Sequence, residues 1–368
     1  MTTTTAPPVL PAADARAPRQ PRSARNKQTN DYFDLAELVN EQGLMERRYG
    51  YYVLRTALLA AGLAVATVLL LTLGQTWWQL AVAVLYGVLF TQGAFLAHDA
   101  AHLQVFRSGR RNEWFSRIIG NLVTGLSHGW WTRKHNKHHA NPNVIGKDGD
   151  IDTGTLVFVP GEAAGRTGFM GWVTRRQGWL FFPMITLFGP VLHASAIRSL
   201  VTTPGVKHRG WEFTLLGVRL VGFTALVYLV LGPVLGTAFL VVQLMTFGFY
   251  MAATFAPNHK GMPLLPKDNS VDFLRRQVLT SRNIKGGWFT EIAMGGLNYQ
   301  VEHHVFPRMP SVNLRQARPI LREFCAERDI PYTETGLFES YGIIVRYLNR
   351  VGIGAADPFD CPIAAQYR

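Results

Sequence analysis

Three short clusters of histidine are the residues of this sequence best suited to chemistry. Residues three or four positions apart on a helix lie on one face, so each cluster directs its imidazoles to one point. Imidazole binds iron, copper, zinc and nickel rather than calcium or magnesium. The spacing therefore predicts a transition-metal site. The clusters are His98 with His102, His135 with His138 and His139, and His303 with His304.

An eighth histidine, His259, follows a long apolar stretch and could reach the same place. About four to six ligands saturate a first-row metal ion, so eight imidazoles suit two ions. The other three of the eleven histidines lack a partner at helical spacing and are expected to be structural or surface residues. They are His128, His193 and His208.

Gln300 stands where the spacing would have placed another histidine. Its amide oxygen could bind a metal weakly or accept from a bound water, or the side chain could lie just outside the site. Asn258 is a further candidate beside His259. Ligating histidines usually donate their second N–H to a carboxylate or carbonyl. The candidates for this role are Asp99, Asp148, Asp150, Asp152, Glu291 and Glu302; Asp99, Asp150 and Asp152 are favoured, and a solvated surface position suits Asp148.

One apolar stretch precedes His98 and another precedes His259. The chain is 48% hydrophobic and 17% charged, and charges are nearly absent from residues 57–73, 77–97, 220–231 and 233–256. Stretches approaching 20 apolar residues are typical of membrane-spanning helices. The turns at 74–76 and 232–233 are short and arrange the helices as two hairpins. We therefore expect spans at about 54–75, 77–97, 212–231 and 233–255.

A fifth apolar stretch, residues 179–197, contains Pro183 and Pro190. If it crossed the membrane, the first two clusters would lie on one side and His259 with the third cluster on the other. A single site needs them together, so we expect 179–197 to be an interfacial or re-entrant helix shielded by protein. The basic loop after it, with Arg198, Lys207 and Arg209, suits the cytoplasmic side.

The net charge of +13 is spread over every polar loop, which argues against nucleic acid and favours an anionic membrane surface or an acidic redox partner. Basic residues beside the spans place both termini and the site in the cytoplasm, in a multi-pass cell-membrane protein. Cys325 and Cys361 lack metal-ligand spacing and are expected to be reduced thiols. Residues 1–30 resemble a disordered basic tail.

The expected fold is thus an all-α integral membrane protein. Four transmembrane helices lie under a helical cytoplasmic cap formed by residues 98–178 and 256–368, with interfacial helices at 179–197 and at 33–48. A nitrogen-rich pair of iron ions can activate O2 and remove hydrogen from an unactivated C–H bond. The spans would admit a lipid chain from the bilayer. The sequence has no phosphate loop or dinucleotide fingerprint, so electrons are expected from a separate protein.

The same residues resemble the histidine boxes of the membrane fatty acid desaturases, HxxxH, HxxHH and (H/Q)xxHH. The stretch GGLNYQVEHHVFPR at 295–308 is similar to the third-box region of front-end (Δ6/Δ5-type) acyl-lipid desaturases, which carry Gln at its first position. HNKHHANPN at 135–143 also fits. The resemblance covers roughly residues 31–331, within an expected desaturase domain at 31–368.

The resemblance implies two non-haem iron ions, held by the seven box histidines with His259 as the additional ligand and Asn258 assisting through water. It implies O2 as co-substrate and a long acyl chain, carried as acyl-CoA or acyl-lipid, in a tunnel between the second and fourth spans and beneath 179–197. The sequence lacks the His-Pro-Gly-Gly haem motif of a fused cytochrome b5. The electron donor is therefore expected to be a separate ferredoxin or flavin/iron–sulfur reductase.

Two alternatives remain open at this point. A related di-iron hydroxylase or ketolase acting on a hydrocarbon or carotenoid would share the histidine boxes. A non-catalytic membrane protein could use paired histidines to hold haem or zinc. The first would add oxygen to its substrate, and the second would show a haem Soret band or a zinc stoichiometry.

Overall fold

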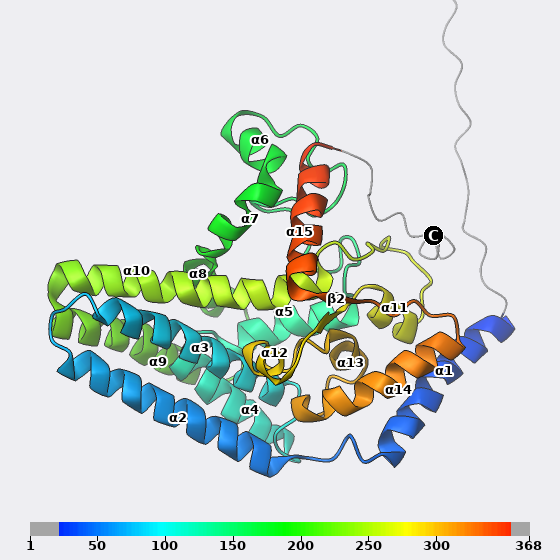
Figure 1. Ribbon diagram of the computed structural model, residues 1–368, viewed down its shortest axis with the longest axis horizontal. Coiled ribbons are helices and arrows are strands. Elements are labelled where there is room, and N and C mark those ends of the chain that lie inside the picture. Colours follow the sequence, from blue (N-terminus) through cyan, green and yellow to red (C-terminus); the bar gives the residue numbers. More distant parts are fainter. Residues whose placement is uncertain (1–21, 355–368) are drawn as a thin grey trace, which may run out of the picture.

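The computed structural model describes residues 22–354, and the side chains of residues 31–354, in a mostly helical arrangement (Figure 1). The first helix begins within the stretch that we expected to be a disordered tail, because residues 22–30 are helical. The rest of that stretch, and Cys361, lie outside the described residues. The elements of the amino-terminal half are α1 Arg22–Glu41, α2 Tyr49–Thr72, α3 Gln79–Ala101, α4 Gly109–Arg117, the π-helix η1 Ile118–Thr124, α5 His128–Ala140, α6 Gly168–Arg175, α7 Gln177–Ile185 and α8 Phe188–Thr202.

The carboxyl-terminal half adds helices and one short pair of strands. Among the described residues the strands are β1 and β2, which pair in parallel with Asn283 opposite Glu334. The elements are α9 Arg209–Gly217, the π-helix η2 Val218–Gly222, α10 Phe223–His259, α11 Phe273–Leu279, β1 Asn283–Lys285, α12 Trp288–Ala293, α13 Gln300–Val305, the 3₁₀ helix η3 Ser311–Asn313, α14 Leu314–Glu327, β2 Glu334–Gly336 and α15 Leu337–Gly352.

Helices α2 and α3 form a long apolar hairpin. Both are long and apolar enough to cross a membrane. On α2 the side chains of Val53, Leu58 and Val65 are more than half exposed. A continuous apolar face of this length would be costly in water, whereas lipid solvates it. Helix α3 is more buried, because it packs between α2 and α10.

The helical run from Arg209 to His259 also passes the length and hydropathy test for a membrane span, but it reverses direction at Gly232. The rings of Phe223 and Phe239 are 6.4 Å apart, although a straight helix would separate these positions by about 24 Å. Gly232 has φ 71° and ψ −179°, a conformation that side-chain-bearing residues rarely adopt. The run is therefore a second hairpin, whose first arm is residues 209–231 (α9, η2 and the start of α10) and whose second arm is the rest of α10, residues 233–259.

Helix α4, η1 and α5 fold as a hairpin alongside α3. A Cβ on Gly93, in the middle of α3, would lie 3.2 Å from Val123 and 3.3 Å from Thr124. Gly120, one turn earlier on η1, faces Ala97. We expected residues 98–178 to belong entirely to a cap above the spans. The structure differs, because the tip of this hairpin lies level with the middle of α3.

The apolar stretch at 179–197 is broken into α7 and α8, which meet at an angle of 71°. Helix α8 lies directly against α10, since a Cβ on Gly189 would be 2.4 Å from the carbonyl oxygen of Leu244. Helix α7 packs on α15, and the two stand above the long helices in Figure 1.

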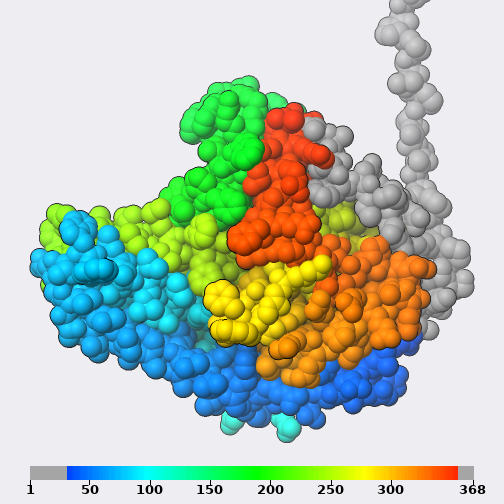
Figure 2. Space-filling view, viewed as in Figure 1, coloured from blue at the N-terminus to red at the C-terminus, as the bar shows by residue number. Residues whose placement is uncertain are grey.

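An apolar core separate from the packing of the long helices joins α1, α11, α13 and α14. Leu35 of α1, Val301 of α13 and Leu321 of α14 are fully buried in it. Figure 2 shows α12 on the surface between this region and the long helices. The histidine-bearing ends of α3, α5, α10 and α13 meet between this core and the long helices.

Candidate metal centre

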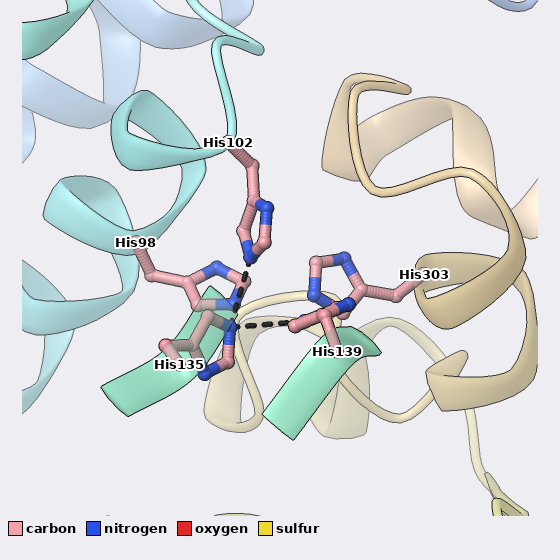
Figure 3. A group of neighbouring side chains, drawn as sticks. All are labelled: His98, His102, His135, His139 and His303. Carbon is pink, nitrogen blue, oxygen red and sulfur yellow. Dashed lines mark hydrogen bonds between the residues drawn. The ribbon is translucent and has the colours of Figure 1, made fainter. Parts of the chain in front are cut away.

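The structure brings all eight histidines of the predicted site together, in two groups. Within each group, one nitrogen from every ring lies within 4.8 Å of the others. Figure 3 shows the larger group, in which rings from three segments converge on one point. The larger group is His98, His102, His135, His139 and His303, and the smaller is His138, His259 and His304.

The Nε2 atoms of the larger group lie especially close to one another. Nε2 of His135 lies 2.8 Å from Nε2 of His102 and 3.0 Å from Nε2 of His139. In the smaller group, Nε2 of His138 lies 3.4 Å from Nε2 of His259. The second cluster therefore does not point to one place, contrary to the prediction from its spacing. His135 and His139 lie in the larger group, whereas His138 lies in the smaller group beside His259 of α10.

Local structure places each ligand-bearing segment. Ser127 caps α5 by accepting a hydrogen bond from the backbone N–H of Trp130. His102 stands at the carboxyl end of α3, where the chain leaves the helix. His259 is the last residue of α10, at the far end of its second arm from the break at Gly232. The centre therefore lies where α3 and α10 both end.

Hydrogen bonds outside the groups orient the three rings of the smaller one. Nδ1 of His138 lies 2.9 Å from a carboxylate oxygen of Asp148. Nδ1 of His259 lies 3.0 Å from the carbonyl oxygen of Thr280. Nδ1 of His304 lies 2.9 Å from Oε1 of Gln277. Each acceptor fixes the proton on Nδ1, so the lone pairs of all three Nε2 atoms face one point.

Several buried ring nitrogens have no hydrogen-bond partner among the described residues. They include Nε2 of His98, Nε2 of His304 and both nitrogens of His303. A buried polar atom without a partner costs about 1–3 kcal/mol, so such a cluster calls for a ligand. A transition-metal ion in each group would satisfy these lone pairs, and the all-nitrogen donor set suits iron, copper or zinc.

Burial favours the neutral form of His303 and His304. It lowers the pKa of His303 and His304 well below the usual value, and neighbouring imidazoles lower both further. Neutral imidazole is the form that binds a metal. The cluster is therefore ready to bind cations at neutral pH.

Gln300 and Asn258 lie at the edge of the smaller group. Nε2 of Gln300 is 2.9 Å from Nε2 of His259, and its Oε1 accepts a hydrogen bond of 3.1 Å from Asn258. Both side chains are buried. The pair thus contacts the three-histidine group rather than the five-histidine group.

The three favoured aspartates differ in the histidine that they contact, and one of them contacts none of the rings. Asp99 lies 3.2 Å from Nδ1 of His98 and also accepts a hydrogen bond from Ser311. Asp150 lies 3.5 Å from Nδ1 of His138 and pairs with Lys134. Asp152 is exposed on the loop.

Both glutamates among the candidates bond to other residues. Glu291 accepts from the hydroxyl of Tyr299, and buried Glu302 accepts from Asn283 and Tyr332. Burial raises the pKa of Glu302 to about 7. Its position between His303 and the β1 strand suggests a role in holding α13.

Sequence reasoning missed two residues that orient the rings, Gln277 and Thr280, and did not favour a third, Asp148. Asp148, considered suited to the surface, is fully buried against His138. Gln277 and the carbonyl of Thr280 lie on and just after α11, and no motif marks them. The acidic run at 148–152 was the available signal, but spacing alone does not tell which of its carboxylates is buried.

The three histidines that were not assigned to the metal site lie in structural or surface positions. Nδ1 of His128 lies 3.0 Å from the hydroxyl of Ser116. His193 stacks on Phe247 and its Nδ1 lies 2.8 Å from the carbonyl oxygen of Gly125. His208 is exposed.

The chain is similar to known proteins over most of its length. The sequence is similar to the Delta(6)-fatty-acid desaturase fat-3 of Caenorhabditis elegans, with 28% identity over 339 residues, covering 88% of this chain and 75% of the relative. It is 28% identical over 359 residues to the Delta(5) fatty acid desaturase fat-4 of the same organism, covering 90% and 76%. It is 27% identical over 354 residues to the Delta(8)-fatty-acid desaturase 2 of Arabidopsis thaliana, covering 89% and 76%.

The family model described as fatty acid desaturase matches residues 75–336, which include all eight clustered histidines. The match spans well over half of the 368 residues. This chain belongs to the fatty acid desaturase family.

Proposed function

We propose that this fatty acid desaturase introduces a cis double bond into a long acyl chain at two iron ions, one held by each histidine group. The observation that carries the proposal is the pair of converging imidazole groups, with buried nitrogens that lack partners. The reaction balances when two vicinal C–H bonds, O2, two electrons and two protons give one carbon–carbon double bond and two molecules of water.

The bound metals would supply O2 activation and removal of hydrogen from an unactivated C–H bond. The protein's own part is to fix geometry. Asp148, Gln277 and the Thr280 carbonyl hold three rings in one tautomer. A misplacement of about 1 Å at such a centre can cost about 100-fold in rate.

The arrangement of the two hairpins supports four membrane crossings, by α2, by α3, and by the two arms on either side of Gly232, residues 209–231 and 233–259. The ends of α3 and α10 that carry His98 and His259 share one site. The opposite ends also lie together, because Nε2 of Gln75 is 4.0 Å from the position of a Cβ on Gly232. Both hairpin turns are then on one side of the membrane and the metal centre is on the other.

The charge distribution supports a cytoplasmic orientation for the centre and both termini. Arg47, Arg48 and Arg55 flank the end of α2 that lies farthest from the hairpin turn. Trp77 and Trp78 at that turn are 66% and 75% exposed, as in aromatic belts at the membrane surface. Helices α7 and α8 are then re-entrant. A topology reporter fused after Arg209 should report a cytoplasmic location, and a reading on the far side would contradict the arrangement.

We assign the electron donor to a separate protein, a ferredoxin or a flavin/iron–sulfur reductase. Exposed basic residues follow two of the ligand-bearing segments. Arg107 lies five residues after His102, and Arg308 lies five residues after His303. A donor with an acidic surface would be attracted to them. Replacing both arginines by glutamate should raise the donor concentration needed for half-maximal turnover, with a smaller effect at high salt.

The decisive test is the fatty acid profile of a heterologous host that expresses this chain with a matching reductase. We expect new unsaturated acyl chains with one defined double-bond position. His138→Asn should abolish them. His208→Asn, an exposed histidine outside both groups, should retain them. Products that gain oxygen would indicate a hydroxylase, and a haem Soret band or zinc without turnover would indicate a binding protein.

A further inference from the structure

The carboxyl end of α10, which carries His259, is buried inside the protein. The last carbonyl groups of an α-helix have no partner within the helix, so at a buried end other segments must supply donors. Asn258 is 0% exposed and His259 is 6% exposed. The carbonyl oxygen of His259 accepts from Nδ2 of Asn143, at 3.2 Å. The neighbouring carbonyl groups need donors of their own.

Arg282, which lies between α11 and β1, supplies three of these donors. Its backbone N–H donates to the carbonyl oxygen of Asn258, at 2.9 Å. Its side chain donates from Nε to the carbonyl oxygen of Pro257, and from Nη2 to that of Lys260, at 2.6 Å. A single residue therefore binds three carbonyl groups at this end of α10.

The side chain of Arg282 is a buried cation that is held by neutral groups. It is 1% exposed, and its acceptors among the described residues are two carbonyl oxygens and the sulfur of Met262. Burial lowers its pKa to about 10, so it still carries its charge at neutral pH. A buried charge is costly unless polar groups stabilise it. The carbonyl end of a helix is the negative end of its dipole, so α10 provides this stabilisation.

The short segment 280–283, which contains this arginine, contacts two of the helices that carry ligands. Toward α10, the carbonyl oxygen of Thr280 accepts from Nδ1 of His259, at 3.0 Å. Toward α13, Oδ1 of Asn283 accepts from the backbone N–H of Val301, at 2.9 Å. The three-histidine group takes one ligand from each of these helices. Segment 280–283 is therefore bonded to the carriers of two of its three ligands.

We propose that Arg282 is a positioning residue of the three-histidine group, because it fixes the end of α10 against segment 280–283. The inference rests on the two-ion centre proposed above. Release of the carbonyl groups that Arg282 binds would let the last turn of α10 fray. His259 is the last residue of that turn, so its Nε2 would lose its fixed place in the group. The five-histidine group takes no ligand from α10 and should be spared.

Two backgrounds allow the two groups to be measured separately. His102→Ala leaves the three-histidine group intact, and His259→Ala leaves the five-histidine group intact. In the His102→Ala background, Arg282→Met should lower the affinity for Fe²⁺ by about 10–100-fold, the usual effect of losing a residue that supports a metal ligand. In the His259→Ala background it should leave the affinity unchanged. Anaerobic equilibrium dialysis of the metal-depleted protein against Fe²⁺ measures both values.

Co²⁺ bound to the three-histidine group gives a second readout, because its visible absorption depends on the geometry of its ligands. In the His102→Ala background, the Co²⁺ bands should shift when Arg282→Met is added. Unchanged bands and unchanged Fe²⁺ affinity in this background would overturn the positioning role.

Arg282→Lys separates the charge of the side chain from its shape. Lysine keeps the charge but places its donors on one nitrogen, so it cannot reproduce the planar fork that binds Pro257 and Lys260. We expect a smaller loss of Fe²⁺ affinity, again only in the His102→Ala background. This milder variant carries the test if Arg282→Met does not fold. Unchanged affinity in Arg282→Lys would show that the fork does not position His259, and would overturn the proposal.

The matched control is Arg219→Met. Arg219 of η2 is also a buried arginine that donates to a backbone carbonyl group, that of Val123, at 2.8 Å. Its removal should lower the thermal midpoint but leave the Fe²⁺ affinity unchanged in both backgrounds. Equal losses of affinity in Arg219→Met and Arg282→Met would show general loosening and would overturn the proposal. So would an equal loss in both backgrounds for Arg282→Met.

The same measurements separate this inference from the centre on which it rests. If neither background binds Fe²⁺ while Arg282 is intact, the two-ion centre is refuted, and the positioning role with it. If both backgrounds bind Fe²⁺ and Arg282→Met weakens neither, the centre stands and the positioning role is refuted.

Discussion

Nδ1 of His138 lies 2.9 Å from Oδ2 of Asp148, and both side chains are buried. The carboxylate of Asp148 also accepts the backbone N–H groups of Asn143 and Asp150, each at 2.9 Å. Burial alone would raise the pKa of Asp148, but its hydrogen bond with His138 lowers it overall. An ionised Asp148 therefore holds the proton of His138 on Nδ1, and the Nε2 lone pair faces His259 and His304.

Asp148→Asn should weaken metal binding at the smaller group. The substitution keeps the size of the side chain but removes the charge that supports His138, and loss of such a partner typically costs about 10–100-fold in metal affinity. Titration of the metal-depleted protein with Fe²⁺, followed by equilibrium dialysis, measures the change. The five-histidine group should retain its affinity.

The control for this prediction is Asp152→Asn, which alters an exposed carboxylate four residues away in the same loop. It should bind iron as the wild type does. The assignment of Asp148 fails if both substitutions weaken binding equally, or if neither does.

The two histidine groups should lose their metals independently. His259→Ala removes a ligand from the three-histidine group only, and His102→Ala removes one from the five-histidine group only. We expect about two irons per wild-type chain, about one in each variant and almost none in the double variant, measured by inductively coupled plasma mass spectrometry. Loss of both irons in either single variant would show one coupled site instead of two.

Metal removal should also lower stability. A ligand present at 100 times its dissociation constant stabilises the folded state by about 2.7 kcal/mol. Chelation should therefore lower the thermal midpoint of the wild type, and the double variant His102→Ala/His259→Ala should barely respond to the chelator. An equal response in both proteins would mean that the chelator acts elsewhere.

Local sequence was enough to anticipate the ligand-bearing segments. His98 with His102, and His135 with His139, share helix faces because the period of the helix is a local property. The long apolar stretches likewise correspond to helices. The ends of these helices differ by several residues from the expected spans. For example, α3 ends at Ala101 instead of residue 97, so His98 lies within the helix.

The remaining features depend on contacts between distant segments. Asp148 and Asp152 are the same residue type in one acidic run, so the sequence does not distinguish them. The fold of the loop around Asn143, which has φ 53°, buries Asp148 and exposes Asp152. Gln277 reaches His304 through the packing of α11 on α13. The apolar run at 118–126 is too short for a span, so length could not reveal that η1 descends beside α3.

Gly189→Ala should destabilise the protein, because α8 and α10 touch through their backbones. The added Cβ would lie 2.4 Å from the carbonyl oxygen of Leu244, which cannot move aside as a flexible side chain could. Overpacking of this kind costs about 1–3 kcal/mol. Thermal unfolding in detergent should show a lower midpoint. In contrast, Gly222→Ala places its Cβ in open space and should leave the midpoint unchanged or raise it slightly. A harmless Gly189→Ala would contradict the close contact.

The thiol of Cys325 should be nearly inert in the folded protein. It is fully buried on α14, and burial raises its pKa to about 12, with Glu302 adding to the effect. The thiolate is the reactive form, so at pH 8 only about one folded molecule in ten thousand is reactive, against about a quarter of unfolded chains, whose thiol pKa is about 8.5.

Maleimide labelling of a Cys361→Ser variant, followed by intact mass spectrometry, tests this prediction. Labelling should be slow in detergent at pH 8 and should become fast on denaturation. Because only the unfolded thiol ionises between about pH 8.5 and 12, this group also disfavours folding as the pH rises through that window. Fast labelling of the folded protein at pH 8 would mean that α14 opens readily, and that the core joining α1, α13 and α14 does not hold α13 and its histidines rigidly.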